Sequence, residues 1–263
     1  MSFHVVRPGA LEYLTADTLA GTKHCFSTRY GGVSEGCLSS LNLGIHRGDV
    51  RGNVIRNYEI LGQTVGFSVE DLVFTHQTHT ATVVRVGARD RGCGIRVEVT
   101  QERDGLITDE AGVALCVFSA DCTPILLWDP AHHAIGAVHA GWRGTAGGIV
   151  KNCVLAMARE FGSVPSQMRA AIGPCIGACC FETDRDVPDA MRAALGSAAD
   201  AAIVCRGGKY HVDLKKLNGL WLAQTGVTQV DISDDCTCCQ PERFWSHRRV
   251  GAQRGSLAAI IEL

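Results

Sequence analysis

The chain has 263 residues, which is long enough for one large domain or two small ones with a sizeable buried core. Hydrophobic residues make up 46%, charged residues 20%, and the formal net charge is -2, so we expect no nucleic acid or anionic membrane as partner and favour a small-molecule ligand. No stretch reaches the roughly 18 apolar residues of a membrane span, and the N-terminal residues show no signal peptide, so we expect a cytoplasmic protein.

Buried strands and one helix are predicted in the middle of the chain. Apolar, β-branched runs predict strands from Val113 to Ser119, from Thr123 to Trp128 and from Ala134 to Val138. A glycine-rich turn over residues 140–145 follows the third strand. Apolar residues then recur at helical spacing from Ile149 to Phe161, with Thr145 as the expected N-cap and Gly162 as the stop.

The remainder of the chain continues the alternation of strands and helices. The pattern predicts a strand near 170–173, a helix over 186–195, a helix capped by Asp213 and running to about Gln224, and strands over 227–232 and 257–261. No repeat or low-complexity linker divides residues 1–263, so we expect a single domain. Interleaved elements imply an α/β or α+β fold, a layered sandwich of mixed β-sheet with flanking helices.

Thirteen cysteines are many for an intracellular chain, and most are expected to be reduced and buried. The cysteines form two clusters in the sequence, Cys175/Cys179/Cys180 and Cys236/Cys238/Cys239. Cys236 and Cys239 have C-x-x-C spacing, but the first cluster offers only C-x-x-x-C. The two paired knuckles of a structural zinc site are therefore not both present in the sequence, so a second metal site is the less favoured alternative and the role of these clusters stays open.

Three candidate metal ligands lie at strand ends or turns: His79, Cys122 and His139. Imidazole and thiolate are zinc ligands, and a catalytic zinc has three protein ligands and one open position. The same residues allow other chemistry. Cys122 could be a thiolate nucleophile with His139 as its base, or the ligands could hold copper. A buried free cysteine beside two hydrogen-bonded histidines is the non-functional alternative.

Several sequence blocks together resemble one bacterial family, the laccase-domain or multicopper polyphenol oxidase proteins later recognised as purine nucleoside phosphorylases. The match spans almost the whole chain, and the blocks ADC and HAGWR are specific in combination. The matching blocks are FSTRYGGVS (26–34), LNLG (41–44), GD (48–49), QTH (77–79), DGLIT (104–108), ADCTP (120–124), VHAGWRG (138–144), IGPCI (172–176) and FWSHRR (244–249).

The resemblance implies that His79, Cys122 and His139 bind Zn²⁺, with Cu²⁺ as the alternative metal. His76, three residues before His79, is expected at the surface or behind the ligands. Arg47 departs from the family, because small or apolar residues are common at that position. The other departures are Asn57-Tyr58 and Cys238-Cys239, so the substrate preference is more open than the metal.

The implied reaction is phosphorolysis of adenosine, inosine, guanosine or methylthioadenosine to base and ribose 1-phosphate, together with deamination of adenosine to inosine. Zinc makes hydroxide available at neutral pH for attack on the adenine ring. A carboxylate must then carry the proton. Asp121, beside a ligand, and Asp104, in a glycine-containing turn, are the candidates, although aspartate also favours such turns for structural reasons.

The candidate contacts to phosphate or ribose are Arg29, Asn42, Arg47 and Arg143. Arg29 and Asn42 have a structural alternative, because they adjoin glycine-marked turns. Arg143 lies in the turn after His139, where a helix N-terminus would attract an anion. We therefore expect purine nucleosides and phosphate as the partners, with phosphate bound beside Arg143.

Overall fold

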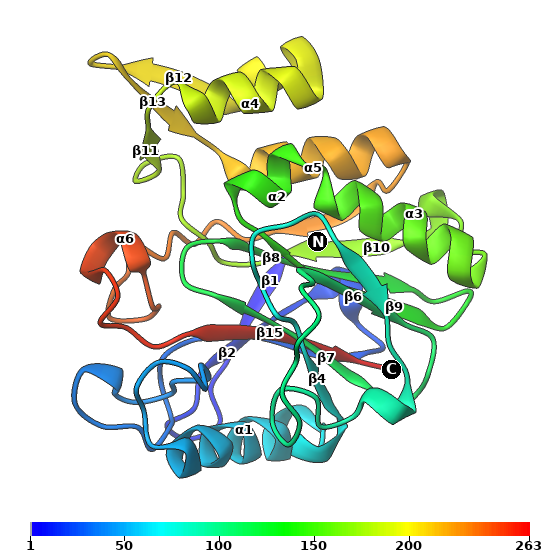
Figure 1. Ribbon diagram of the computed structural model, residues 1–263, viewed down its shortest axis with the longest axis vertical. Helices are drawn as coiled ribbons and strands as arrows, with labels where there is room; N and C mark the ends of the chain where they lie inside the picture. The colour runs from blue at the N-terminus through cyan, green and yellow to red at the C-terminus, as the bar shows by residue number, and fades with distance from the viewer. Residues whose placement is uncertain (1) are drawn as a thin grey trace.

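The computed structural model describes residues 2–263, whose strands form two six-stranded mixed sheets and one small antiparallel sheet (Figure 1). The first sheet has the order β1(Phe3–Val6), β2(Tyr13–Ala16), β3(Lys23–Ser27), β15(Leu257–Glu262), β7(Ala114–Ser119) and β4(Leu72–Phe74). The second has the order β14(Gln229–Ile232), β10(Arg169–Ile172), β8(Thr123–Asp129), β9(Ala134–Ala140), β6(Gly105–Thr108) and β5(Val83–Arg85). The third contains β11(Glu182–Thr183), β13(Lys209–Val212) and β12(Ile203–Arg206).

Helices cover the outer faces of the two large sheets. The α-helices are α1(Arg51–Val65), α2(Trp142–Ala146), α3(Ile149–Phe161), α4(Asp186–Leu195), α5(Leu214–Thr225) and α6(His247–Val250). The 3₁₀ helices are η1(Asp17–Leu19), η2(Gly36–Leu38), η3(Val69–Asp71), η4(Ala88–Asp90), η5(Pro165–Gln167) and η6(Gly196–Ala202). In Figure 1, α1 lies on one side of the sheets, while α3 and α5 lie on the other.

Three hydrophobic cores separate four layers. The middle core lies between the two large sheets and contains Val117 of the first and Ala137 of the second. A second core joins the first sheet to α1, and a third joins the second sheet to α3 and α5. The fold is therefore a helix–sheet–sheet–helix sandwich, and the predicted layered class is confirmed.

The apolar runs are continuous because both faces of the central strands are buried. In β7, Cys116 faces the core beside α1, while its neighbour Val117 faces the core between the sheets. In β8, Leu126 and Leu127 divide in the same way between the middle core and the core under the helices. Alternate residues of a strand point to opposite faces, so a strand buried on both sides lacks polar alternation.

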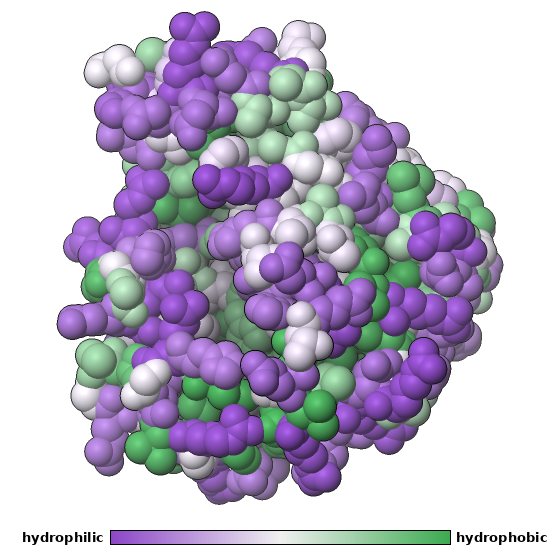
Figure 2. Space-filling model, viewed as in Figure 1, coloured by the Kyte–Doolittle hydropathy of each residue, from purple (hydrophilic) through white to green (hydrophobic). Residues whose placement is uncertain are grey.

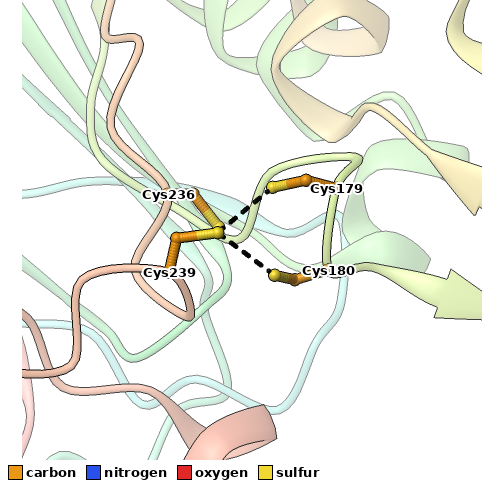
Figure 3. A group of neighbouring side chains, drawn as sticks. All are labelled: Cys179, Cys180, Cys236 and Cys239. Carbon is orange, nitrogen blue, oxygen red and sulfur yellow. Dashed lines mark hydrogen bonds between the residues drawn. The ribbon is translucent and has the colours of Figure 1, made fainter.

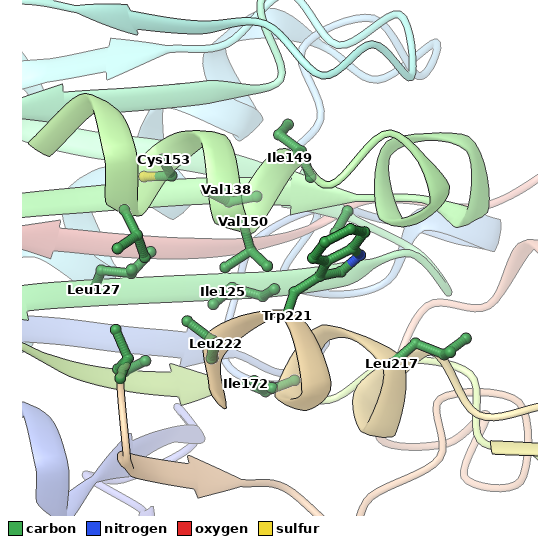
Figure 4. Packing of buried hydrophobic residues seen from close by; sticks show 14 of the residues in the cluster. Ile125, Leu127, Val138, Ile149, Val150, Cys153, Ile172, Leu217, Trp221 and Leu222 are labelled. Carbon is green, nitrogen blue, oxygen red and sulfur yellow. The ribbon is translucent and has the colours of Figure 1, made fainter. Parts of the chain in front are cut away.

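Buried apolar side chains of α3, α5 and the second sheet gather in the core between them (Figure 4). Val150 of α3 and Trp221 of α5 lie over Ile125 of β8 in this view. The indole Nε1 of Trp221 also donates a hydrogen bond to the Thr145 carbonyl oxygen at 2.8 Å. This contact ties α5 to α2, directly after the strand that carries His139.

Most predicted boundaries agree with the structure to within two residues. The helix over 186–195 and the Asp213 cap are confirmed, since the Asp213 carboxylate accepts a hydrogen bond from the Lys216 amide at 3.0 Å. Gly162 ends α3 with a positive φ of 74°, a conformation that glycine adopts without strain. The strand predicted to end at Val138 continues to Ala140.

The predicted role of Thr145 as N-cap of the long helix is wrong. Thr145 lies inside the short helix α2, and a separate helix begins at Ile149. Gly148 between them has φ +68° and ψ 35°, a left-handed conformation that interrupts the helix. Thr145 is instead buried, and its hydroxyl accepts a hydrogen bond from the Asn218 side chain at 3.0 Å.

Among residues 2–263, no helix combines the length and apolar character required to cross a membrane. In Figure 2, hydrophilic residues cover most of the visible face, and hydrophobic ones lie mainly in recesses and small groups between them. This distribution is the one expected when the apolar side chains are collected in internal cores.

Candidate metal centre and pocket

The three candidate ligands come from three separate segments of the chain. His79 lies in the loop between β4 and β5, Cys122 lies in the tight turn between β7 and β8, and His139 lies in the last part of β9. Their ligand atoms all lie within 4.8 Å of one another. The backbone of His79 and of Asp121, beside Cys122, has positive φ, at 63° and 96° respectively. Such conformations recur where a turn must aim a side chain into a site.

Gly141 makes this close approach possible. A Cβ atom at position 141 would lie 2.5 Å from Nδ1 of His79 and 3.2 Å from Sγ of Cys122. The first distance is below any normal non-bonded contact, so a side chain would displace His79. A residue without a Cβ is therefore required directly after β9.

Asp104 orients His139. The carboxylate Oδ1 lies 2.7 Å from Nδ1 of His139, and both side chains are buried. This bond leaves Nε2 of the ring as the nitrogen available to a metal. A carboxylate behind a histidine ligand is the usual way in which proteins set the ring orientation and raise ligand basicity.

Asp104 also holds the loop that carries His79. Its carboxylate accepts hydrogen bonds from the backbone amides of Thr78, His79 and Thr80 at 3.2, 3.1 and 2.9 Å. The Thr80 hydroxyl donates to it at 2.9 Å. Asp104 thus connects two of the three candidate ligands and is itself fully buried.

Asp121 is also engaged in hydrogen bonds with its surroundings. Its Oδ1 accepts a hydrogen bond from the Thr237 hydroxyl, and its Oδ2 accepts one from the Arg248 amide, both at 2.6 Å. The Asp121 carboxylate therefore fastens the turn that carries Cys122 to residues 237–248. Neither carboxylate predicted to carry protons is among the residues that line the pocket described below.

The electrostatics of the group favour a thiolate. Burial opposes ionisation of Cys122, but the neighbouring His139 and His79 lower the pKa of its thiol to about 6. Burial likewise opposes protonation of His139, whereas Cys122 and Asp104 raise its pKa to about 9. A thiolate and two imidazoles are the donors that zinc prefers, so the residues present fit a three-ligand zinc site.

A pocket of about 660 Å³ opens over the three candidate ligands, a volume within the usual range for small-molecule sites. His46, His76 and Phe118 lie on its wall. The Phe118 ring packs edge-on against the Phe74 ring, with 4.9 Å between the ring centroids. His76, expected at the surface or behind the ligands, is exposed at the pocket wall. The ligands therefore face a space large enough for a nucleoside.

Arg254 is a pocket residue that sequence reasoning missed. It is buried just before β15, and its Nε has no hydrogen-bond partner among residues 2–263. Burial and the nearby positive charge of Arg47 lower its pKa to about 10, so it remains charged at neutral pH. Arg47 lines the same pocket and donates from Nε to the Ser256 hydroxyl at 3.2 Å. Two guanidinium groups facing one pocket favour an anion between them.

The other predicted substrate contacts lie elsewhere. The guanidinium carbon of Arg29 lies 3.8 Å from the centre of the Trp245 ring. The same guanidinium donates hydrogen bonds to the backbone carbonyls of Pro241 and Ser39. Arg143 is exposed, and its guanidinium carbon lies 4.3 Å from the centre of the Trp142 ring. Arg143 is not among the residues that line the pocket.

Asn42 is buried behind the pocket and supports its wall. Its side-chain oxygen accepts hydrogen bonds from the amides of Gly44 and Ser256 at 2.9 and 3.0 Å. Both residues line the pocket, whereas Asn42 does not. No local sequence pattern shows that Arg254 lines the pocket and that Asn42 does not, because both positions depend on how distant segments of the chain pack together.

The protein is therefore a sandwich of two sheets between helices, with a His/Cys/His group that could hold a metal ion under its pocket. Residues 23–263 match the family described as multi-copper polyphenol oxidoreductase laccase, and the chain belongs to that family.

Similar proteins carry enzyme names. The chain is 39% identical over 253 residues to purine nucleoside phosphorylase YlmD of Geobacillus stearothermophilus, covering 94% of this chain and 92% of that protein. It is 35% identical over 238 residues to adenosine deaminase RL5 of an unknown prokaryotic organism, covering 88% and 90%. The crystal structure of YlmD from G. stearothermophilus superposes with a TM-score of 0.92 at 37% identity, covering 98% of both chains.

Proposed function

We propose that this chain is a zinc-dependent purine nucleoside phosphorylase that also deaminates adenosine. Its substrates are adenosine, inosine, guanosine or methylthioadenosine together with phosphate. The observation that carries the proposal is the placement of a His/Cys/His group and two arginines around one pocket. The names of the relatives support the same two activities.

Each part of the pocket has a proposed task. A zinc ion held by His79, Cys122 and His139 supplies Lewis acidity at the floor of the pocket. Arg254 and Arg47 bind phosphate, because an anion offsets the repulsion between two guanidinium groups that share a cavity. The Phe118 ring provides an apolar surface for the purine.

We propose positioning roles for Asp104 and Asp121 in place of the proton transfer expected from the sequence. A general base must reach the proton that it removes, directly or through one water. The Asp104 carboxylate is enclosed by His139 and the 78–80 loop, and the Asp121 carboxylate faces Thr237 and Arg248. His76 is the proposed proton carrier, since it lines the pocket and its ring makes no hydrogen bond within residues 2–263.

Two other functions use the same residues. The thiolate–imidazole pair of Cys122 and His139 would suit a cysteine hydrolase, and the family description names copper oxidases. The purified protein distinguishes them by metal analysis and by product analysis with adenosine and phosphate. Zinc with formation of adenine, ribose 1-phosphate and inosine supports the proposal. Copper with oxygen uptake on phenols, or metal-free activity abolished by thiol alkylation, would replace it.

A matched pair of arginine variants tests the phosphate site. Arg254→Ala should raise the phosphate KM of phosphorolysis about 10–100-fold, because a charge-assisted hydrogen bond contributes roughly 1.5–3 kcal/mol. Deamination consumes no phosphate and should change less. Arg143→Ala, outside the pocket, should leave the phosphate KM unchanged. If the phosphate KM increased only in Arg143→Ala, the phosphate site would be assigned to the turn after His139 instead.

A further inference from the structure

Four cysteines outside the pocket meet from two distant loops. Cys179 and Cys180 lie between β10 and β11, whereas Cys236 and Cys239 lie between β14 and α6. Their sulfur atoms all lie within 4.8 Å of one another. Figure 3 shows the two loops facing each other. Sγ of Cys239 lies 3.5 Å from Sγ of Cys179 and 3.4 Å from Sγ of Cys180.

The spacing of the sulfurs matches a single tetrahedral ion. Zinc–thiolate bonds of about 2.3 Å place four tetrahedral sulfurs about 3.8 Å apart. A cluster of several iron atoms spreads its cysteine sulfurs more widely, so the observed spacing favours one ion. The two shortest sulfur distances, 3.4 and 3.5 Å, are too long for disulfide bonds, and all four cysteines are free.

The backbone around these cysteines also suits thiolate ligands. The Gly177 amide donates a hydrogen bond to Sγ of Cys236 at 3.1 Å, an interaction that stabilises a thiolate. A β-bridge between Cys175 and Cys236 and a hydrogen bond from the Thr237 amide to the Cys175 carbonyl at 3.1 Å join the two loops. The cysteines are therefore presented by backbone that already fixes one loop against the other.

A cation lies beside the cluster. Nη1 of Arg248 donates to the carbonyls of Cys180 and Glu182, both at 3.0 Å, and the guanidinium lies 5.5 Å from the Phe181 ring. Four thiolates around a divalent ion carry a net negative charge, which a neighbouring guanidinium stabilises.

We propose that Cys179, Cys180, Cys236 and Cys239 bind a structural Zn²⁺ ion, separate from the metal site under the pocket. Binding releases the protons of the four thiols to solvent and involves no redox change. The ion would hold residues 236–248 in place, and these residues supply Thr237 and Arg248 to Asp121 beside Cys122. The sequence showed only one C-x-x-C pair, because the other two ligands are adjacent in the chain.

Zinc stoichiometry of the full chain, purified with reductant and zinc, is the first test. We expect about two zinc ions per chain in the wild type and in Cys205→Ser, a control at an exposed cysteine of β12. Cys239→Ser should lose half of the zinc. Full retention of zinc in Cys239→Ser overturns the proposal, whether the wild type binds one zinc ion or two.

A second measurement needs no variant in the cluster. In His79→Ala/Cys122→Ser, which lacks two of three ligands under the pocket, the remaining zinc should show four sulfur neighbours at about 2.3 Å by X-ray absorption. Nitrogen or oxygen neighbours, or no bound zinc, would refute the site. Disulfides among these four cysteines that persist in wild-type protein purified with reductant, detected by intact mass, would also refute it.

Discussion

Asp104 has a role that depends on both of its oxygens. It accepts a hydrogen bond from His139 and from three successive backbone amides of the His79 loop, so one carboxylate orients two candidate ligands. Such supporting carboxylates act on metal affinity rather than on proton transfer. The distinction between the two roles can be measured directly.

Asp104→Asn should lower zinc affinity at the pocket site about 10–100-fold, because the neutral amide orients His139 less well and places an N–H donor opposite groups that themselves donate. Competition with a chromophoric chelator measures the affinity. Asp121→Asn is the matched control and should bind zinc more nearly as the wild type does. Unchanged zinc affinity in Asp104→Asn, with slow deamination, would return Asp104 to the role of proton carrier.

Glu12 is a second buried carboxylate, placed between two arginines. It lies 2.6 Å from Nε of Arg243 and 2.6 Å from Nε of Arg7. Burial alone would raise its pKa, but the hydrogen bonds from Arg243 and Arg7 lower the pKa below 4.5. The folded state therefore favours the ionised carboxylate.

Glu12→Gln should lower the free energy of unfolding by about 1–3 kcal/mol at neutral pH, because it removes the charged partner of Nε in Arg243 and leaves that guanidinium paired only with Asp235 at Nη1. Because the pKa of Glu12 is lower in the folded state, the ionised carboxylate stabilises the fold fully at pH values above its unfolded pKa of about 4.5. This stabilisation is lost as the pH falls through the lowered folded-state pKa. Urea titrations of both proteins across this range test the expectation. A difference that grows as the solution becomes acidic would contradict it.

At the scale of elements, α3 shows how one helix face carries the stability. Met157 is fully buried against the second sheet, whereas Leu155, two residues earlier, is half exposed. The helix therefore provides an internal comparison between burial and helix propensity.

Met157→Ala should destabilise the protein by about 2–5 kcal/mol, because it removes buried methylene groups and leaves a cavity. Leu155→Ala, a change of similar chemistry on the exposed face, should stay within about 0.5 kcal/mol of the wild type. Chemical denaturation monitored by tryptophan fluorescence gives both values. Similar losses in the two variants would mean that Leu155 is buried in solution, for example by a second copy of the chain.

Helix α1 was not predicted, for a physical reason visible in its residues. It starts after Val50 without a side-chain cap, and its buried face includes the polar Asn57 beside Tyr58. The side-chain oxygen of Asn57 accepts a hydrogen bond from the Val33 backbone amide at 2.8 Å. Its side-chain nitrogen donates one to the Asn42 backbone carbonyl, also at 2.8 Å. A polar residue satisfied by distant loops weakens the local amphipathic pattern.

At the scale of the whole molecule, the last strand holds the first sheet together. β15 lies between β3 and β7, and every residue of it is buried. Its partners come from residues 23–27 and 114–119, so this sheet cannot be completed until the C-terminal segment has been paired.

Removal of residues 257–263 should therefore prevent folding, since it exposes two central strands and opens two cores. Loss of soluble monomer, or loss of the cooperative thermal transition, measures this outcome. Removal of Leu263 alone, which follows β15, is the control and should preserve the transition. A truncated chain that unfolds cooperatively near the wild-type temperature would contradict the central role of β15.

Elements whose signals are local could be predicted from the sequence. Continuous apolar runs identified β7, β8 and β9, Asp213 identified the start of α5, and Gly162 identified the end of α3, because backbone propensity and capping act within a few residues. The blocks around His79, Cys122 and His139 also identified the family, which the comparison with residues 23–263 supports.

The side chains that share a site could be identified only from the folded structure. Arg254 and Arg47 face one pocket, and Cys179 meets Cys239, although about 200 and 60 residues separate the partners. Arg143, which is close to a candidate ligand in sequence, stacks on Trp142 and does not line that pocket. These outcomes follow from the order of the strands, and that order is set by pairing between distant segments, which leaves no periodicity in the chain.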